Sequence, residues 1–452
     1  MSQRATTDLL RYWVAFEDPV TRRDYLRHGA ALILLKYGVD ALLVFAATGN
    51  FWTPLDYFRS PPFLIANRFD ASAAFLAPAL VAWTLPFLWI GISMTIRRLL
   101  DAGWSAWWSL LFFVPLLNYA LIAVLCVAPG RMSAISPRVV PDGSVPRLPS
   151  ALLSIAFGAL LGLAMLSLAV FWIESYGLAL FMGTPFVIGL ITAYVLCRRY
   201  PASLMETIEV VFMTIVMTAG AGLVVGIDGA VCFAMAAPLG LVIAWMGGIA
   251  GRFMANMGEA PGRGAVLIAV LLPGGAAAEA GDHAAALREV TTSVIIEAAP
   301  ADVWDHVVAF PPIAEPRSLL FRLGIAYPVR AEIRGSGVGA IRYCVFSTGA
   351  FVEPITAWEP GSRLAFDVVE SPRPLEELSI RSTSPPHLDG YLVPRAGEFR
   401  LVPLPDGRTR LEGSTWYEQR LRPEGYWVLY SDYLIGRIHH RVLEHIRIEA
   451  ER

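Results

Sequence analysis

The chain has 452 residues, of which 56% are hydrophobic and 16% are charged, and its mean hydropathy is +0.54. Because soluble domains usually carry about 25% charged residues, this composition excludes a wholly soluble protein. The formal net charge of −2 offers no basic surface for nucleic acid, and four cysteines without any C-x-x-C spacing argue against a disulfide framework or a thiolate metal site.

Seven apolar runs are long enough to cross a bilayer, whose hydrocarbon core of about 30 Å takes roughly 20 helical residues. They cover approximately 29–48, 73–96, 104–128, 151–173, 177–197, 206–226 and 229–250. The preceding segment, residues 1–28, carries five arginines, and no small-residue cleavage site follows the first run. We therefore interpret that run as an uncleaved span.

The distribution of arginines in the short loops predicts the orientation, because Lys and Arg stay on the cytoplasmic side. Arginines lie in loops 131–150 and 198–204 and after the last span, whereas the hairpins at 174–176 and 226–229 carry one acid each and no base. The last four spans are therefore expected to start and end inside. This pattern predicts a cytoplasmic C-terminal domain, on the side opposite to the two hairpins.

Three full crossings before residue 129 would place an arginine-bearing loop outside the cell. The run at 104–128 is interrupted by Pro115 and Asn118, so we favour a re-entrant hairpin that is buried in protein. The alternative is that a short eighth run, Ala265–Leu272, crosses the membrane and inverts the later spans. In the first span, Lys36 and Asp40 are one helical turn apart and are interpreted as a self-neutralising pair.

After a Gly- and Ala-rich linker, the charge density rises and period-2 alternation indicates β-strands. Expected strands cover about 290–297, 329–334, 339–348, 351–358, 363–370, 397–404 and 408–418. Helices are expected at 301–310 and 423–449. The Gly335–Gly339 segment lacks the Lys-Ser/Thr of a phosphate-binding loop and is interpreted as a turn.

Two resemblances add to this outline. The segment RRLLDAGWSAWW at 97–108, followed by Pro115, resembles the bacterial inner-membrane family called domain of unknown function 805, over about residues 10–130. Leu100 stands where that family usually has His. The resemblance implies a membrane location and no known chemistry.

Residues 287–452 resemble the SRPBCC superfamily, which includes START-like and polyketide cyclase-like domains. An opening strand leads through AAPADVW at 298–304 into a short helix, and a curved sheet and a long C-terminal helix follow. The resemblance implies a helix-grip fold with a deep apolar cavity that binds lipids, sterols or polyketides. Only some members of the superfamily are enzymes.

The predicted fold class is therefore a multi-span α-helical membrane bundle followed by a cytoplasmic α+β helix-grip domain. The expected division of the chain is 1–28 (N-terminal cytoplasmic segment), 29–130 (the region resembling domain of unknown function 805), 131–150 (cytoplasmic loop), 151–250 (four spans), 251–286 (linker) and 287–452 (START-like domain).

Aromatic residues are dense in the C-terminal domain, as expected for a pocket between sheet and helix. The predicted ligand-binding residues are Trp427, Tyr430, Leu434, Phe346, Phe351, Phe366, Glu353, Tyr417 and His387. His387 could alternatively act in acid–base chemistry with Glu353, Glu398, Glu412 or Asp432. We assign no catalytic residue, no metal ligand and no cofactor, and we interpret His439, His440 and His445 as a solvated or boundary face.

The predicted function is the binding of a lipid or other apolar small molecule by a domain anchored in the bacterial inner membrane. A cyclase- or dehydratase-type enzyme and a scaffold for another protein are the alternatives. The expected partners are membrane lipids and an apolar ligand, not nucleic acid, and the sequence leaves a protein partner open.

Overall fold

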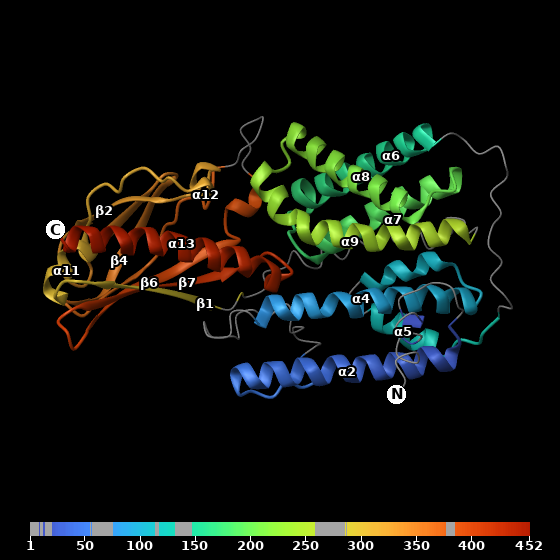
Figure 1. The fold of residues 1–452 in the computed structure, drawn as a ribbon, viewed down its shortest axis with the longest axis horizontal. Coiled ribbons are helices and arrows are strands. Elements are labelled where there is room, and N and C mark those ends of the chain that lie inside the picture. Colours follow the sequence, from blue (N-terminus) through green and yellow to red (C-terminus); the bar gives the residue numbers. More distant parts are fainter. Residues whose placement is uncertain are drawn as a thin grey trace.

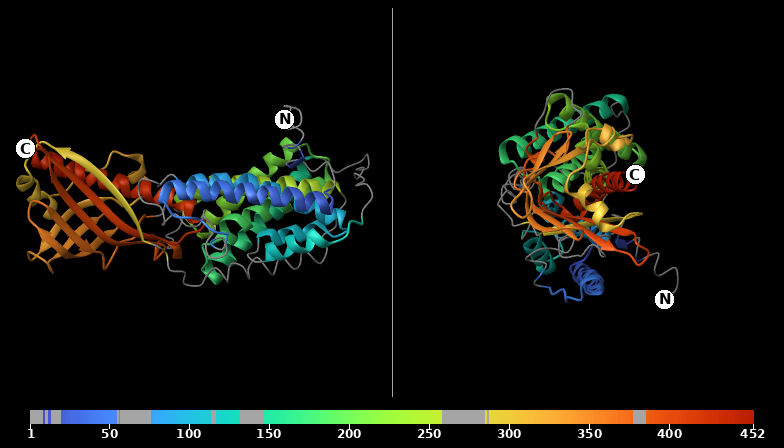
Figure 2. Two further views of the ribbon diagram at one scale, coloured as in Figure 1. Left: turned by 90° about the horizontal axis from the view of Figure 1, so that it is seen from below. Right: turned by 90° about the vertical axis from the view of Figure 1, so that its left-hand side faces the viewer.

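The computed structural model describes residues 9, 12–13, 20–54, 56, 76–113, 117–131, 147–257, 285, 287–376 and 385–452. A helical bundle and a sheet domain lie end to end along the longest axis of the molecule (Figures 1 and 2). The bundle comes from the N-terminal part of the chain and the sheet domain from the C-terminal part. This two-part architecture is the one that the sequence predicts.

The bundle consists of long apolar helices. Their bounds are α2 (Arg22–Thr48), α4 (Leu76–Asp101), η4 (Ala106–Phe113), α5 (Leu117–Val127), α6 (Arg147–Ser167) with η5 (Leu168–Ile173), η6 (Ala179–Gly183) with α7 (Thr184–Arg199), α8 (Leu204–Val225) and α9 (Ala230–Asn256). Five of these stretches, namely α2, α6 with η5, η6 with α7, α8 and α9, are long and apolar enough to cross a membrane. Large apolar side chains such as Leu34 and Leu160, each 68% exposed, face outward from them, as expected where lipid replaces water.

Hydrogen bonds join the two ends of the segment at 104–128, as the favoured hairpin requires. Arg98 is fully buried, donates to the carbonyl oxygens of Leu125 and Ala128, and pairs with Asp101 at 2.5 Å. The backbone N–H of Arg131 donates to the Asp101 carbonyl at 2.7 Å. The chain therefore enters and leaves at the same end of the bundle, and the RRLLDAG motif fixes that entry.

The predicted pair in the first span is also present. Lys36 Nζ lies 2.5 Å from Asp40 Oδ2, and the Asp40 side chain is fully buried. A buried carboxylate beside an ammonium group needs no further partner to be tolerated at this depth. The contact agrees with the self-neutralising pair expected from the sequence, and its structural role stays a prediction.

Helices α7 and α9 approach so closely that only glycine fits at their contact. A Cβ atom added to Gly189 would lie 1.9 Å from the carbonyl oxygen of Ala244 in α9, and one added to Gly247 would lie 2.0 Å from the Phe186 oxygen. Because the blocking atoms belong to backbone, neither helix can make room by a rotamer change.

We therefore expect Gly189→Leu to separate α7 from α9, at a cost above the roughly 1–3 kcal/mol that overpacking of a core usually causes. Thermal unfolding of the detergent-solubilised chain should shift to a clearly lower temperature, with loss of the monodisperse chromatographic peak. Gly220→Leu on α8 is the control, because nothing lies within 4 Å of its added Cβ. Equal thermal stability of the two variants would show that the α7–α9 contact does not hold the bundle together.

The C-terminal part has the predicted helix-grip arrangement. A seven-stranded antiparallel sheet has the order β1-β7-β6-β5-β4-β3-β2, and helix α13 (Glu424–Ala450) lies across it (Figures 1 and 2). The other bounds are β1 (Leu287–Ile296), α11 (Pro300–Val308), α12 (Leu319–Arg322), β2 (Pro328–Arg334), β3 (Ile341–Phe346), β4 (Gly349–Glu359), β5 (Arg363–Asp367), η7 (Pro386–Leu388), β6 (Leu392–Pro403) and β7 (Thr409–Gln419).

One buried ion pair attaches α13 to the sheet. Arg288 of β1 binds both oxygens of Asp432 on α13, and Tyr417 of β7 donates its hydroxyl hydrogen to the same carboxylate at 2.6 Å. The side chains of Arg288 and Tyr417 are almost completely buried. This contact holds α13 at a fixed distance from the sheet. It therefore sets how much space remains between the sheet and the middle of the helix.

The predicted placement of the hairpins opposite to the C-terminal domain is wrong. Tyr391 donates to the carbonyl oxygen of Glu174, and Tyr426 donates to that of Met235 in the first turns of α9. The hairpins at 174–176 and 226–229 therefore lie on the same side of the bundle as the domain. The arginine pattern alone could not predict this contact, because it depends on loop charges and not on how the C-terminal domain packs against the bundle.

The boundary of the linker also differs from the expected one. Helix α9 continues to Asn256, at the end of the bundle that points away from the domain (Figure 1). The first residues of the predicted linker at 251–286 are therefore helical. The eighth apolar run, Ala265–Leu272, lies outside the described residues.

Candidate functional site at the junction of bundle and sheet domain

The first of two cavities lies inside the sheet domain, between the sheet and α13. It has a volume of about 160 Å³. Of the predicted ligand-binding residues, its lining includes Phe346, Phe351, Glu353, Phe366 and Leu434. This cavity is the one that the sequence predicts between sheet and helix.

A buried ion pair forms the polar part of this cavity. Arg342 of β3 binds Glu353 of β4, and their side chains are 1% and 6% exposed. Burial raises the pKa of the Glu353 carboxyl, and the neighbouring guanidinium opposes this shift. The Arg342 guanidinium also lies 5.4 Å from the centre of the Phe366 ring. Each charge is thus already satisfied by its neighbour.

A second cavity, of about 200 Å³, lies where the sheet domain meets the bundle. The domain contributes Trp427, Tyr430 and His387 to its lining, and the bundle contributes side chains from α7, α8 and α9 such as Ile188 and Ile215. The Trp427 ring packs edge-on against Phe181 of the bundle, with ring centres 4.8 Å apart. The predicted residues at the start of α13 therefore line the junction and not the interior of the domain.

The two cavities share a wall. Ile325, Pro374, Leu392 and Leu434 line both of them. Tyr417, also a predicted ligand-binding residue, lines neither cavity, because its hydroxyl is engaged by Asp432. Eight of the nine predicted residues thus border a cavity, but they are divided between two neighbouring chambers.

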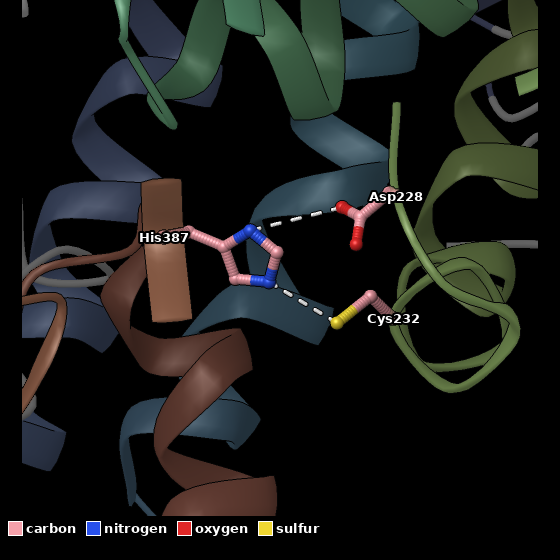
Figure 3. A group of neighbouring side chains, drawn as sticks. All are labelled: Asp228, Cys232 and His387. Carbon is pink, nitrogen blue, oxygen red and sulfur yellow. Dashed lines mark hydrogen bonds and ion pairs between the residues drawn. The ribbon is translucent and has the colours of Figure 1, made fainter. Parts of the chain in front are cut away.

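Three reactive side chains meet at the edge of the junction cavity (Figure 3). His387, from η7 of the domain, places Nε2 3.1 Å from Sγ of Cys232 and Nδ1 3.8 Å from Oδ2 of Asp228. Asp228 belongs to the turn between α8 and α9, where its other oxygen accepts a hydrogen bond from the Gly229 N–H at 2.8 Å. Cys232 is the third residue of α9. Residues about 155 positions apart in the sequence are thus brought together by the docking of the domain.

Burial controls the charge of His387, whose side chain is only 9% exposed. Burial lowers the pKa of His387 to about 4, against a smaller opposing effect of Asp389. The imidazole is therefore neutral at pH 7, and one of its two ring nitrogens carries a lone pair that can accept a hydrogen bond. Tyr176 packs against the ring, with centres 4.8 Å apart, which fixes its orientation.

The same three residues are the one group of potential metal ligands found among the described residues, with ligand atoms within 4.8 Å of one another. A metal ion needs its ligands around one point. Here Nδ1 of the imidazole faces Asp228 and Nε2 faces Cys232, and both groups approach the ring from the α8–α9 turn (Figure 3). The 3.1 Å between Nε2 and Sγ also fits a thiol beside a base.

None of the acids considered with His387 in the sequence is the one that faces it. Glu353 pairs with Arg342, Glu398 with Arg363, Glu412 with Arg410, and Asp432 with Arg288. The acid that faces His387 comes from the bundle, and so does the thiol. Sequence reasoning missed Cys232 because it lies inside an apolar run, although the Asp-Gly turn ahead of it marks a helix start.

His439, interpreted from the sequence as solvated or at a boundary, is half-buried and lines the cavity between sheet and helix. It lies 2.7 Å from the hydroxyl oxygen of Thr415 and 3.3 Å from that of Thr292. Burial lowers its pKa to about 4. The absence of metal ligands on this helix stays a prediction.

Comparison with known proteins agrees with the N-terminal resemblance. The family described as "Protein of unknown function (DUF805)" matches residues 13–134. No curated protein matches the chain. The segment that matches this family contains the hairpin at 104–128 and the ion pair of Arg98 and Asp101.

Solved structures match the C-terminal region at low identity. A norcoclaurine synthase from Thalictrum flavum is 16% identical, with 37% of this chain and 95% of that chain covered and a TM-score of 0.25. An aromatase/cyclase from Streptomyces sp. R1128 is 18% identical, with 37% and 94% covered and a TM-score of 0.24. A protein from Nitrosospira multiformis is 17% identical, with 36% and 94% covered and a TM-score of 0.23. At these scores, the assignment of the helix-grip fold rests on the strand order and on α13.

Proposed function

We propose that this membrane protein binds an elongated apolar molecule, such as a lipid acyl chain, in the two adjoining cavities. The observation that carries this proposal is the shared wall of Ile325, Pro374, Leu392 and Leu434. Movement of these four side chains would join the chambers into one channel from the bundle into the domain. An apolar chain of several carbons fits such a path better than a compact polar metabolite does.

The expected energy of binding supports an apolar ligand. Burial of about 300 Å² of apolar ligand surface contributes several kcal/mol at about 25 cal/mol per Å², before the costs of association. The buried indole Nε1 of Trp427, in the wall of the junction cavity, has no hydrogen-bond partner among the described residues. A ligand with one polar group near this end could supply an acceptor to the indole.

The bundle gives the ligand a direct source. Helices α7, α8 and α9, whose stretches are apolar enough to span a membrane, form one side of the junction cavity. A lipid could therefore pass from a membrane leaflet to the domain without crossing water. We keep the bacterial inner membrane as the proposed location, in line with the family match at residues 13–134.

Leu434→Trp should weaken binding, because Leu434 borders both cavities and the larger indole would fill their shared wall. We expect wild-type full-length protein in nanodiscs to bind a fluorescent long-chain fatty acid with micromolar affinity or better. Leu434→Trp should reduce this affinity about tenfold or more, which corresponds to at least about 1.4 kcal/mol.

Tyr433→Trp is the matched control, since this neighbouring residue on α13 is 60% exposed and lines neither cavity. Its affinity should equal that of the wild type. Equal affinity of Leu434→Trp and wild type would place the ligand elsewhere. No binding by well-folded wild-type protein, with no lipid found by mass spectrometry after purification, would favour a scaffold.

A further inference from the structure

The cluster of Cys232, His387 and Asp228 has no role in holding an apolar chain. Nε2 of the imidazole lies 3.1 Å from the thiol sulfur, and a carboxylate oxygen of Asp228 lies 3.8 Å from Nδ1 (Figure 3). All three residues line the junction cavity. The cluster is therefore placed where a polar group of a bound apolar molecule would meet it.

We propose that Cys232 is a nucleophile that accepts the acyl group of a long-chain ester or thioester, with His387 as its general base. This inference rests on the proposed function, because the cavity must first bind the acyl chain. The proposal assigns the imidazole proton to Nδ1, which lies 3.8 Å from Asp228 Oδ2, and leaves Nε2 to accept the thiol proton.

The local structure places the N–H groups of a helix end beside Cys232. Helix α9 begins at Ala230, and its N-cap residue, Gly229, has no side chain to cap the first turn. The first N–H groups of a helix have no partner within the helix and carry the positive end of its dipole. They can stabilise the oxyanion that forms when the sulfur attacks a carbonyl.

The position of Cys232 also suits an acyl ester. The residue lies in the first turn of a helix that is long enough to cross the hydrocarbon core, and so near one boundary of that core. The ester carbonyls of membrane lipids lie at this boundary. A carbonyl placed there would leave its acyl chain to extend into the apolar cavity, toward side chains such as Ile188 and Ile215.

The reaction balances without an oxidant or a metal. The thiol proton moves to His387 Nε2 as Sγ bonds to the carbonyl carbon. The bond from that carbon to the leaving oxygen or sulfur then breaks, and the leaving group takes the proton from the imidazolium. The product is an S-acyl thioester on Cys232. Water, deprotonated by His387, can release the fatty acid and restore the thiol.

The test uses the full-length protein in nanodiscs with two acyl donors: a soluble long-chain acyl thioester of a small thiol, and phospholipids of the nanodisc itself. We expect intact-protein mass spectrometry to find one added acyl group, mapped to Cys232 and removed by hydroxylamine. The donor that produces the adduct identifies the source of the acyl group. Wild-type protein that gives no adduct with either donor would overturn the proposal.

Three variants separate a chemical role from a structural one. Cys232→Ala should form no adduct, and His387→Gln should form it about 10²-fold more slowly, as expected for loss of a general base. Cys126→Ala is the thiol control. Cys126 lies in α5 and packs with the cluster that includes Leu125 at the far end of the bundle, so this variant should form the same amount of adduct as the wild type. Equal rates for wild type and His387→Gln would contradict the role of the imidazole.

Two further measurements keep this inference distinct from the binding proposal. Cys232→Ala should still bind the fluorescent fatty acid, so binding without an adduct would remove the thiol chemistry alone. An adduct that forms equally fast with an acetyl donor, in protein that does not bind the fatty acid, would remove the binding proposal alone. Stoichiometric zinc that copurifies with the wild type and is lost in both Cys232→Ala and His387→Gln, without any adduct, would make the cluster a metal site instead.

Discussion

Alkaline phosphatase fused after Arg452 should be active, and a green fluorescent protein at the same position should be dark, because we infer that the sheet domain lies outside the cytoplasm. The domain contacts the hairpins at 174–176 and 226–229 through Tyr391 and His387. The arginines of the described bundle gather at the other end. By the positive-inside rule, that other end is the cytoplasmic one.

The two ends of the bundle are defined by packing. Val44, Leu76 and Leu80 cluster with Val428 of α13, which marks the end that meets the domain. Tyr25, Leu99 and Leu125 cluster at the far end. The helices whose ends lie there carry arginines in their terminal turns: Arg22 and Arg23 begin α2, Arg97 and Arg98 end α4, Arg147 begins α6, Arg198 and Arg199 end α7, and Arg252 lies in the last turns of α9. In the sequence, the connection between α2 and α4 at 49–75 contains two arginines and two aspartates.

The matched control is a pair of fusions after Asn256, at the far end of α9. These should give the opposite signals, with dark phosphatase and bright fluorescence. The chain between Asn256 and Leu287 must then pass from one face of the membrane to the other, as the alternative reading of the Ala265–Leu272 run requires. A bright fluorescent protein after both Asn256 and Arg452 would restore the cytoplasmic placement predicted from the sequence and would mean that the domain does not dock on the hairpins.

The sequence predicted those features that depend on local pattern. Apolar runs gave the helices, period-2 alternation gave the strands near their observed bounds, and Pro115 with Asn118 indicated the re-entrant hairpin. In each case the sequence pattern and the element that it predicts involve residues close together in the chain. Burial of an apolar face or stretch then determines which element forms. The Lys36–Asp40 pair was predictable for the same reason, since four residues make one helical turn.

The site was predictable only in part, because it depends on docking between distant segments. The spacing of Trp427, Tyr430 and Leu434 shows that they share a face of α13, but not that the face continues past the sheet into the bundle. Cys232 and His387 lie 155 positions apart, and nothing in either local sequence refers to the other. Predicting their contact would require knowing how the domain docks on the α8–α9 turn.

The ion pair inside the domain gives the second large expected effect. Arg342→Met removes one partner of a buried pair and leaves the Glu353 carboxylate in an apolar cavity. Such a change typically costs about 3–5 kcal/mol. Hydrogen exchange of the β3 and β4 amides in the full-length protein should report this loss as faster exchange. Replacement of both residues, Arg342→Met with Glu353→Leu, should recover most of the stability, because no charge is left unpaired.

The pH dependence of this variant follows from Glu353. Burial already raises the pKa of this carboxyl in the folded protein, and loss of the guanidinium should raise it further above the unfolded value of about 4.3. Between these two pKa values the folded state binds more protons than the unfolded state. The stability of Arg342→Met should therefore fall as the pH rises through this window and should be highest below pH 4.

Arg330→Met provides the surface control for the same chemistry. Arg330 and Glu332 are 2.5 Å apart, but their side chains are 42% and 58% exposed. Water can solvate Glu332 after the change, so we expect a cost of at most about 1 kcal/mol and little dependence on pH. If Arg342→Met were no more destabilised than Arg330→Met, water would have to reach Glu353, and the cavity between sheet and helix would be hydrated and not an apolar chamber for a ligand.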